Sequence, residues 1–466
     1  MTAVSAPAVE RVALYPPTVQ PPPRPLPLRR FLLRFVRNPL QSLPLPVYEE
    51  PIVVHDNGRS IVAWVTHPSL VEKILLHANE HFPKTELEKQ VFASTLGDGI
   101  LTSSGASWRW QRRTAAPLFR PADLANLVPA MTRAAEEQLA RWRGAAPGTM
   151  QPVDRDMTET TFHVISATMF AGSADAEAKA ILNAADTALA TISWDIAAAM
   201  LRVPSWVWYP GKFRRRRAGR ALRASVAAIL ARRHAAGMAG DDLLGRLARA
   251  QDPDTGAPMS EKQLIDNLVT FLAAGHETTA KALTWTLYLL ARAPEWQERV
   301  HGEVAAVIGN GAVEARHLDE LPVTRAVLKE SMRLYPPAPV MTRVAADQMA
   351  LGGQTIPAGT LIVIPVYAVH RHRKLWDDPD RFDPTRFSPE REAAYKRTQF
   401  MPFGFGLRTC IGMSFAMMEA VAILATLVQH ARFGWDGRHA PEPVSRVTLR
   451  PRGGMPLMVW LREDMP

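Results

Sequence analysis

A long apolar stretch from Ser260 to Ala291 constrains the fold more than any other part of this chain. Ser260 and Gln263 have the spacing of a capping box, which predicts that a helix starts here, and Pro294 lies just beyond its expected end. About 31 residues at roughly 1.5 Å each give roughly 46 Å, enough to cross a whole domain. Because apolar residues leave little polar face, we expect a buried central helix around which the chain is organised.

Polar residues interrupt this helix in the middle, at residues 274–279 with the sequence AGHETT. Gly275 costs about 1 kcal/mol of helix propensity, and Thr278 can bond back to a carbonyl and loosen the turn, so we expect a local opening that admits water. A buried Glu277 beside the Thr278 hydroxyl suits proton delivery, because burial can raise a carboxyl pKa towards working pH. The alternative is a solvent-facing Glu-Thr-Thr on an amphipathic helix, which the apolar surroundings disfavour.

Cys410 is the only cysteine among 466 residues, so it cannot close an intrachain disulfide or build a multi-cysteine metal site. Its chemistry is that of a nucleophile or of a single axial ligand, unless it is simply a small buried apolar residue. Gly404, Gly406 and Gly412 let the backbone turn tightly and approach a flat partner, and Arg408 adds a cation. Apolar residues at helical spacing follow, and a helix start helps to hold a thiolate. We favour a ligand.

The spacing of Phe403, Gly406, Arg408, Cys410 and Gly412 resembles the haem-binding signature of the cytochrome P450 monooxygenases. The resemblance implies that the Cys410 thiolate is the axial iron ligand of a haem b (iron protoporphyrin IX). In that family the electron donation of the thiolate favours O–O bond cleavage. It also implies that Phe403 and Arg408 belong to the cofactor-binding residues.

Three further segments match the family in the expected order. Trp108 and Arg112 share one face of an expected helix, and although a Trp-and-Arg face is often a solvated patch, the family's WxxxR pattern contacts a haem propionate. Arg343 matches another propionate-binding position. The AGHETT stretch matches the oxygen-binding groove, with Ala274 and Gly275 as cofactor-binding residues.

The same groove places Glu277 and Thr278 at the family's catalytic acid and alcohol positions, although many members carry Asp where this chain has Glu277. Glu330 and Arg333, three apart on an expected helix from Pro322 to Leu334, match its ExxR element. As an isolated helix pair they are worth only a few tenths of a kcal/mol. In the family they join an Arg, here Arg386, in a buried structural network.

Composition sets broader limits. The chain is 47% hydrophobic and 21% charged, as expected for a globular protein, and 55 basic against 45 acidic residues give a net charge of +10. That charge suits an acidic protein surface, nucleic acid or an anionic membrane without choosing among them. A single cysteine excludes a disulfide scaffold and a fused iron–sulfur module, and a cytoplasmic location is the default.

The N-terminal part is expected to lack a packed core. Residues 1–27 show no signal-peptide pattern, and no apolar run reaches the 18 or so residues of a spanning helix, so we expect a soluble chain without a transmembrane anchor. Their prolines favour extended conformations, which predicts a mostly disordered lead-in. Residues 28–40 mix arginines with apolar residues and suit either a membrane surface or a first helix packed on the domain.

Other local patterns predict the remaining elements. They are a hairpin over Ile52 to Val65 with a type I′ turn at Asn57-Gly58, a helix from Pro68 to Leu76, a long irregular connection from Glu86 to Ser107, helices over Ala130 to Arg143 and Glu159 to Met200, an aromatic break over Val203 to Pro210, a helix opening at Arg214, and a small sheet within Met349 to Val366.

Taken together, the resemblance implies a mainly α fold with a smaller β region, the cytochrome P450 fold. Residues 1–40 are expected to form a lead-in with a basic amphipathic segment, and residues 41–466 a single haem-thiolate domain of the soluble, bacterial, stand-alone type. Such an enzyme inserts one oxygen atom from O2 into an apolar organic substrate such as a fatty acid or terpenoid. Alternatives are a peroxide-using or rearranging relative, and a non-catalytic haem sensor or nucleic-acid binder, for which no groove-reading motif is found.

The electron donor is expected to be a separate ferredoxin or flavodoxin, because the chain carries no second cofactor module. In the family the donor docks on the face nearest the cysteine. Here that face offers Arg109, Arg113, Arg120, Lys396 and Arg397, and long-range attraction to an acidic partner raises association rates at low salt.

Overall fold

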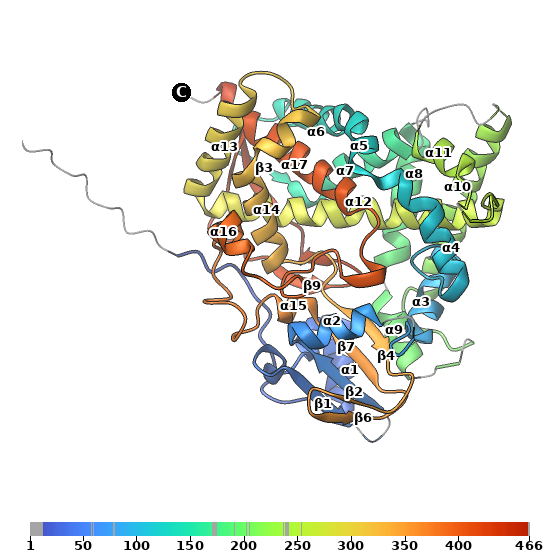
Figure 1. The fold of residues 1–466 in the computed structure, drawn as a ribbon. Coiled ribbons are helices and arrows are strands. Elements are labelled where there is room, and N and C mark those ends of the chain that lie inside the picture. The colour runs from blue at the N-terminus through green and yellow to red at the C-terminus, as the bar shows by residue number, and fades with distance from the viewer. Residues whose placement is uncertain are drawn as a thin grey trace, which may run out of the picture.

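Helix α12 (Glu261–Arg292) crosses the middle of the molecule (Figure 1). Its 32 residues correspond to about 48 Å. The predicted capping box is confirmed, because the Ser260 side chain accepts from the Gln263 backbone N–H while the Gln263 side chain reaches back to Ser260. The helix continues unbroken through residues 274–279, so the expected local opening is wrong. The Thr278 hydroxyl donates to the Ala274 carbonyl at 2.8 Å without displacing the backbone.

This computed structural model describes residues 13–464 except 57, 59, 78–79, 170–174, 191, 202, 205, 236, 238–241 and 253. The fold is mainly α with a smaller β region, as expected. Besides α12 the helices are α1 (Leu28–Arg37), α2 (Pro68–Leu76), α3 (Glu86–Leu96), α4 (Gly105–Ala115), α5 (Pro121–Leu124), α6 (Val128–Arg143), α7 (Val153–Met169), α8 (Asp175–Ala190), α9 (Ile192–Met200), α10 (Lys212–Ala235), α11 (Leu243–Arg249), α13 (Pro294–Ile308), α14 (Pro322–Leu334), α15 (Val366–Val369), α16 (Pro389–Glu392) and α17 (Met413–His430).

The strands form small sheets, and the largest lies beside the helical body (Figure 1). Its order is β1-β2-β7-β4, with β2 parallel to β7 and the other pairs antiparallel. A three-stranded sheet has the order β3-β11-β8, and β5-β6 and β9-β10 are separate pairs. The strands are β1 (Ile52–Asp56), β2 (Ile61–Val65), β3 (Thr149–Pro152), β4 (Met341–Val344), β5 (Met349–Leu351), β6 (Gln354–Ile356), β7 (Leu361–Ile364), β8 (Ala431–Gly434), β9 (Glu442–Ser445), β10 (Leu449–Arg452) and β11 (Pro456–Leu461).

The main core surrounds α12, which packs against α7, α10, α14 and α17. Trp285 of α12 is completely buried, stacks on Tyr335 with ring centroids 3.8 Å apart, and donates from Nε1 to the Leu449 carbonyl at 3.1 Å. An aromatic side chain of this kind buries roughly 150–250 Å² of surface, so this stacked pair is a strong local contact of α12. Among the described residues, α17 alone is long and apolar enough to cross a membrane, and 67% of that helix is buried inside the protein.

Several predicted elements differ from the structure. The stretch from Glu86 to Ser107, expected to be irregular, begins with helix α3, because the Thr85 hydroxyl accepts from the Glu88 N–H and starts the helix. The single helix expected over Glu159 to Met200 is divided into α7, α8 and α9. The hairpin is present, but Asp56 pairs with Ile61, which leaves four residues between the strands in place of a two-residue turn. Asn57 lies outside the described residues.

The proline-rich lead-in is not free of the body. The Tyr335 hydroxyl donates to the Pro17 carbonyl at 2.8 Å, and the Val19 N–H donates to the Tyr367 hydroxyl at 3.2 Å. Val19 is buried. The expectation of disorder is therefore wrong for residues 13–27, because an extended segment without internal hydrogen bonds finds its partners on the body. The division of the chain at residue 41 stays a prediction.

A buried ion pair joins helix α14 to the segment that leads to the cysteine. Arg333 donates from Nε and Nη2 to both oxygens of Glu330, at 2.7 and 2.8 Å, and neither side chain is exposed. Arg386 of the short 3₁₀-helix η6 (Pro384–Phe387) lies 3.6 Å from Glu330. The network expected from the family resemblance is present.

We expect Glu330→Ala to yield little folded protein, because a buried arginine that loses its partner costs about 3–5 kcal/mol. The control is Glu463→Ala, which removes the exposed Arg143–Glu463 pair and is worth less than about 1 kcal/mol. Urea unfolding of both variants measures the difference. A Glu330→Ala protein with the wild-type midpoint would contradict a structural role for this pair.

Candidate functional site

The loop that carries Cys410 is shaped by a close approach to helix α2. Gly406, with φ +71°, opens the 3₁₀-helix η7 (Gly406–Arg408), and a Cβ placed on it would lie 2.6 Å from the Leu75 carbonyl oxygen. Only glycine fits both the backbone angle and the contact. The Cys410 N–H donates to the Phe403 carbonyl at 2.9 Å, which closes the loop just before α17 starts. The cysteine is thereby held at the beginning of a buried helix, as predicted.

The Cys410 side chain is exposed, and it is the free cysteine of the chain. Burial by the surrounding protein nevertheless raises the pKa of the thiol, while the Gly412 N–H and the Arg112 guanidinium oppose that shift. The sulfur is therefore accessible at the surface while protein atoms surround it on its other sides. Both opposing groups favour the thiolate.

Two of the predicted residues contact each other beside the cysteine loop. The Arg408 guanidinium lies over the Trp108 ring, 3.8 Å from its centroid, and donates to the Ser103 carbonyl at 3.0 Å. Trp108 is buried in helix α4. Burial, together with the nearby Arg343 and Arg112 cations, lowers the pKa of Arg408 to about 10, and Glu88 acts in the opposite direction. The contact links α4 to the loop of Cys410.

Arg343 of β4 is buried and incompletely paired. Its Nη1 donates to the Thr342 carbonyl at 2.6 Å, while Nε has no hydrogen-bond partner among the described residues. Burial lowers the pKa of this guanidinium, with Glu88 acting in the opposite direction. A buried donor without a partner is costly and indicates a missing acceptor.

Two residues that sequence analysis missed belong to the same cluster. Lys84 pairs with Glu88 at 2.8 Å, and both act electrostatically on Arg343 and Arg408. Together with Arg112 the cluster has four cations and one carboxylate. The Thr85-to-Glu88 spacing, a cap signal at a helix start, was the available sequence clue.

This donor set fits the carboxylates of a haem. Four cations against one carboxylate leave an excess of positive charge, and the buried Arg343 Nε supplies a donor that needs an acceptor. Charge-assisted hydrogen bonds to carboxylates are the strong ones, and arginine is suited to make them. The accessible sulfur of Cys410 supplies the axial donor.

Helix α12 presents two different faces at residues 274–279. Ala274 is exposed, and Gly275 and Thr278 are partly exposed, whereas His276, Glu277 and Thr279 are buried. An accessible face in the middle of an otherwise buried helix is where a flat ligand can contact α12. At Gly275 a Cβ would lie 2.8 Å from the Cδ1 atom of Ile165 in α7, so a side chain there would have to displace the tip of that isoleucine.

Glu277 lies on the buried side and is ion-paired. Arg450 of β10 donates from Nε to Glu277 Oε1 at 2.6 Å, and the Thr448 hydroxyl donates to the same oxygen. Burial alone would raise the pKa of Glu277, but Arg450, Thr448 and Lys281 together hold it below its ordinary value. The expected raised pKa is therefore wrong. Glu277 and Thr278 are neighbours in sequence, but Glu277 is buried and bonds to Arg450 while Thr278 is partly exposed and bonds to the Ala274 carbonyl.

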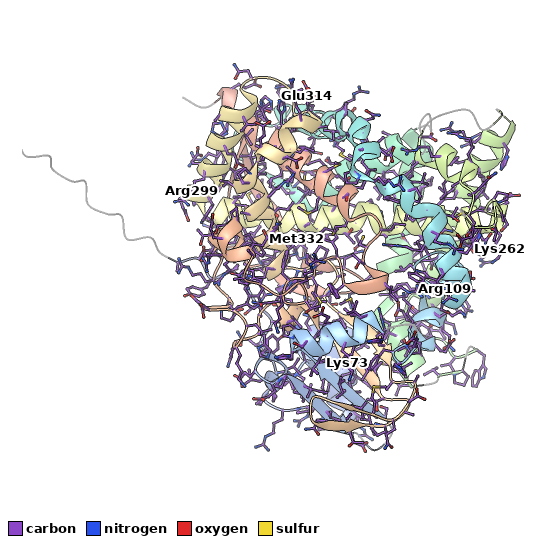
Figure 2. The ribbon with its side chains drawn as sticks, in the orientation of Figure 1. Lys73, Arg109, Lys262, Arg299, Glu314 and Met332 are labelled. Carbon is purple, nitrogen blue, oxygen red and sulfur yellow. The ribbon has the colours of Figure 1, made fainter. Side chains whose placement is uncertain are left out.

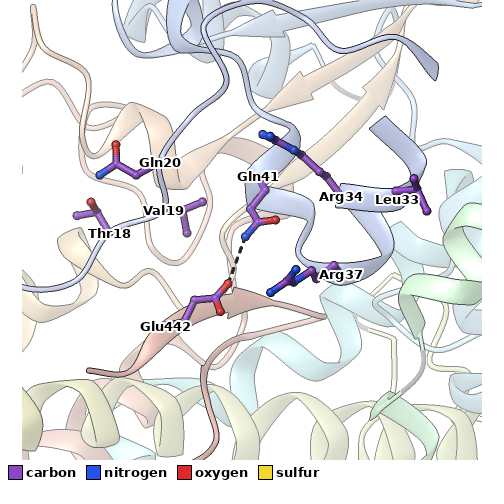
Figure 3. Close-up of a pocket in the computed structure, with 8 residues that line it drawn as sticks. All are labelled: Thr18, Val19, Gln20, Leu33, Arg34, Arg37, Gln41 and Glu442. Atoms are coloured by element: carbon purple, nitrogen blue, oxygen red, sulfur yellow. Dashed lines mark hydrogen bonds between the residues drawn. The ribbon is translucent and has the colours of Figure 1, made fainter. Parts of the chain in front are cut away.

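A surface pocket of about 590 Å³ is lined by a different set of residues from those around Cys410 and Arg343 (Figure 3). Figure 3 shows its lining residues, which come from the lead-in, helix α1, the residue Gln41 and strand β9. None of the predicted site residues lines it. Its volume alone does not make it the reaction site, because Cys410 and the cation cluster are absent from it.

Comparisons with known proteins agree with the fold. Residues 20–457 match the family described as Cytochrome P450. The chain is 33% identical over 417 residues to a cyclooctat-9-en-7-ol 5-monooxygenase of Streptomyces melanosporofaciens, covering 88% of each chain. It is 32% identical over 418 residues to a cytokinin hydroxylase of Arabidopsis thaliana, covering 86% of this chain and 79% of that one. It matches a crystal structure of the cytochrome P450DA heme domain with a TM-score of 0.81 and 25% identity, covering 95% and 98%.

The chain belongs to the cytochrome P450 family. It is an oxidoreductase of the monooxygenase class, and the family implies a haem cofactor, the use of O2 and a redox partner. The family resemblance noted in the sequence is confirmed.

One buried acid close to this site was not predicted. Glu419 of α17 is completely buried, and neither of its oxygens has a hydrogen-bond partner of normal geometry among the described residues. Burial raises its pKa from 4.5 to about 8, although the nearby Thr279 hydroxyl acts to lower it. The carboxyl is therefore neutral at pH 7 in the folded protein.

We expect Glu419 to make stability depend on pH. Its folded pKa lies above its unfolded value, so its contribution is complete below about pH 4.5 and is lost as the pH rises towards 8. Glu419→Gln has no group that titrates here. Between pH 5 and 8 its free energy of unfolding should therefore rise by up to about 4 kcal/mol relative to that of the wild type. Urea unfolding at several pH values measures it. Parallel pH profiles for the two proteins would show that Glu419 is ionised when folded.

Proposed function

We propose that this chain is a haem b monooxygenase that inserts one oxygen atom from O2 into an apolar organic substrate, using electrons from a separate ferredoxin or flavodoxin. The observation that carries the proposal is the accessible Cys410 thiol beside a cation cluster whose buried Arg343 Nε needs an acceptor. When bound, haem supplies the iron at which O2 is activated. We also propose a cytoplasmic location, which a single cysteine in the chain supports.

The residues of the chain divide into three roles in this proposal. Cys410 binds the iron through Sγ, and the Phe403 carbonyl fixes its backbone. Arg112, Arg343 and Arg408, with Trp108 beneath Arg408, hold the two carboxylates of the cofactor. Ala274 and Gly275 present the accessible face of α12, where Gly275 acts through the packing of α7 against this helix.

Thr278 is the proposed catalytic alcohol. Its side chain is partly exposed on the same face as Ala274, and its hydroxyl proton is directed to the Ala274 carbonyl. That hydrogen bond leaves lone pairs of the oxygen free to accept a proton donor, such as water. The hydroxyl can therefore orient a proton for transfer towards the reacting oxygen.

Glu277 is proposed as the acid that relays this proton, and because its pKa is held below the ordinary value it must first take up a proton from water. The carboxylate is held by Arg450, whose side chain is about one quarter exposed. To reach Thr278, Glu277 must leave Arg450, or the proton must pass along water. The ion pair thus connects the buried acid to the surface at strand β10.

The proposed substrate class rests on this chain's own residues, because the two relatives named above act on different compounds. One turn before Ala274, Phe271 packs edge-on against Phe119 with ring centroids 5.4 Å apart. The half-buried Val340 precedes strand β4, which carries Arg343. These apolar residues, close in sequence to Ala274 and Arg343, support a largely hydrocarbon substrate such as a fatty acid or terpenoid.

The surface proposed to bind the electron donor differs by one residue from the five basic residues predicted from the sequence. Arg113 pairs with Asp252 at 2.8 Å and also with Asp254, so its charge is neutralised. Arg109, Arg120, Lys396 and Arg397 remain exposed, and Figure 2 shows Arg109 on the outer side of α4. Leu407 and Met413, on either side of Cys410, are exposed apolar residues. An apolar centre with a basic rim suits an acidic electron-transfer protein.

We expect the reduced, carbon monoxide-bound protein to show the red-shifted Soret band of thiolate ligation. Cys410→Ser should lose this band, because a serine oxygen donates less electron density to the iron. Met413→Leu, three residues away on the same surface, is the control and should keep the band. A wild-type spectrum typical of imidazole ligation would rule out Cys410 as the ligand.

We expect Thr278→Ala to keep haem content and substrate binding while most consumed electrons appear as hydrogen peroxide, with coupling to product falling about tenfold or more. The control is Thr286→Ala, which removes an equivalent hydroxyl on α12 that donates to Ala282 at 2.7 Å but is completely buried. Product formed per NAD(P)H oxidised measures the coupling. Equal coupling in both variants would remove Thr278 from proton transfer.

A further inference from the structure

Glu88 is the one carboxylate that acts on Lys84, Arg343 and Arg408 in the described part of the chain. It lies in the first turn of α3, where its backbone N–H donates to the Thr85 hydroxyl at 3.1 Å. A carboxylate among cations that are proposed to hold an anionic cofactor opposes that binding by charge repulsion. The role of Glu88 must therefore be other than binding the cofactor.

Two contacts fix the Glu88 carboxylate in place. Its Oε1 atom accepts from Lys84 Nζ at 2.8 Å, and its Oε2 atom faces the Thr342 hydroxyl at 3.5 Å. Thr342 also contacts Arg343, because the Thr342 carbonyl accepts from Arg343 Nη1 at 2.6 Å. The carboxylate is therefore held where the start of α3 meets strand β4, next to the arginine proposed to bind the cofactor.

This junction is closely held and partly shielded from water. The Val344 N–H donates to the Pro83 carbonyl at 3.0 Å, which joins β4 to the residue before Lys84. The side chains of Lys84 and Glu88 are only 13% and 22% exposed, and Arg343 is buried. Charges that are mostly removed from water act on their surroundings more strongly, and salt screens them less.

The balance of charge shows what Glu88 does to the cofactor site. Four positive charges come from Lys84, Arg112, Arg343 and Arg408, and Glu88 adds one negative charge. The two carboxylates of a haem bring the sum to +1, whereas without Glu88 the sum is +2. Arg343 Nε keeps no hydrogen-bond partner among the described residues, so Glu88 leaves this donor to the cofactor. Its effect on the cofactor is one of charge.

We propose that Glu88 lowers the reduction potential of the bound haem and thereby limits how readily the electron donor reduces it. The proposal rests on the haem-thiolate function proposed above. One electron passes from the donor to the iron, and the fixed negative charge of Glu88 opposes this added negative charge. Burial and the groups around a haem are among the means by which a protein sets its potential. Lys84 and Glu88 therefore act with opposite signs, because Lys84 raises the potential.

A purely structural role for Glu88 gives a different expectation. Removing either Lys84 or Glu88 breaks the same ion pair of 2.8 Å, so both losses would loosen the start of α3 in the same way. The reduction potential would then shift in the same direction in both variants. Opposite shifts distinguish an effect of charge from an effect of structure.

The test is a spectroelectrochemical titration of the haem-loaded full chain. At the electrode potential at which the wild type is half reduced, Glu88→Gln should show a ratio of reduced to oxidised haem about threefold higher or more. Lys84→Met should show a lower ratio than the wild type. Glu88→Asp keeps the charge on a shorter side chain and should stay close to the wild type.

The matched control is Glu86→Gln, which makes the same charge change two residues earlier on α3. Glu86 is exposed, so water and salt screen its charge and this variant should titrate like the wild type. High salt should leave most of the difference between Glu88→Gln and the wild type in place, because Glu88 is partly shielded. Circular dichroism and urea unfolding show whether each variant is folded.

The carbon monoxide spectrum of the reduced wild type separates failure of this inference from failure of the proposed function. If the thiolate band is present and Glu88→Gln has the wild-type potential, the role of Glu88 is wrong while the haem-thiolate site stands. An equal shift in Glu86→Gln, or shifts of the same sign in Glu88→Gln and Lys84→Met, also overturns that role. A wild type without the thiolate band overturns both proposals.

Discussion

The buried pair between Glu330 and Arg333 is the interaction on which the cysteine loop depends. Arg333 also donates to the carbonyls of His370 and Pro379, at 2.8 and 2.7 Å. The His370 ring in turn accepts the Met401 N–H at 3.0 Å, and Met401 begins the segment that leads to the loop. Burial and the neighbouring Arg333 and Arg371 lower the pKa of His370 to about 3, so its ring stays neutral and Nε2 can accept. One ion pair thereby positions a backbone nine residues before Cys410.

Local sequence signals predicted those parts of the site whose structure is decided locally. The capping box at Ser260, the helix that contains Glu330 and the glycines around Cys410 depend on residues only a few positions apart, so spacing was sufficient. Helix α3 also had such a signal at Thr85, but its weak apolar periodicity hid it. Lys84 and Glu88 were missed for that reason, although they complete the charge balance around Arg343 and Arg408.

Contacts between distant segments could not be predicted in the same way. Arg450 lies 173 residues from Glu277, and nothing in the AGHETT stretch indicates which cation will meet its acid. The proline-rich lead-in shows a related difficulty. Its proline content indicates that the segment lacks internal hydrogen bonds, but it does not indicate that Tyr335 and Tyr367 form hydrogen bonds with it. In both cases the partner is selected by tertiary packing, which periodicity does not encode.

The geometry of an α-helix explains why an acid and an alcohol next to each other in sequence behave differently here. Successive residues on a helix are rotated by about 100°, so Glu277 and Thr278 cannot both face the same space. Thr278 shares its face with Ala274, four residues earlier, and is accessible. Glu277 instead faces β10, where Arg450 compensates the cost of burying its charge. A proton that passes from one to the other must therefore travel around the helix, and the strength of the Glu277–Arg450 pair sets how readily the acid takes part.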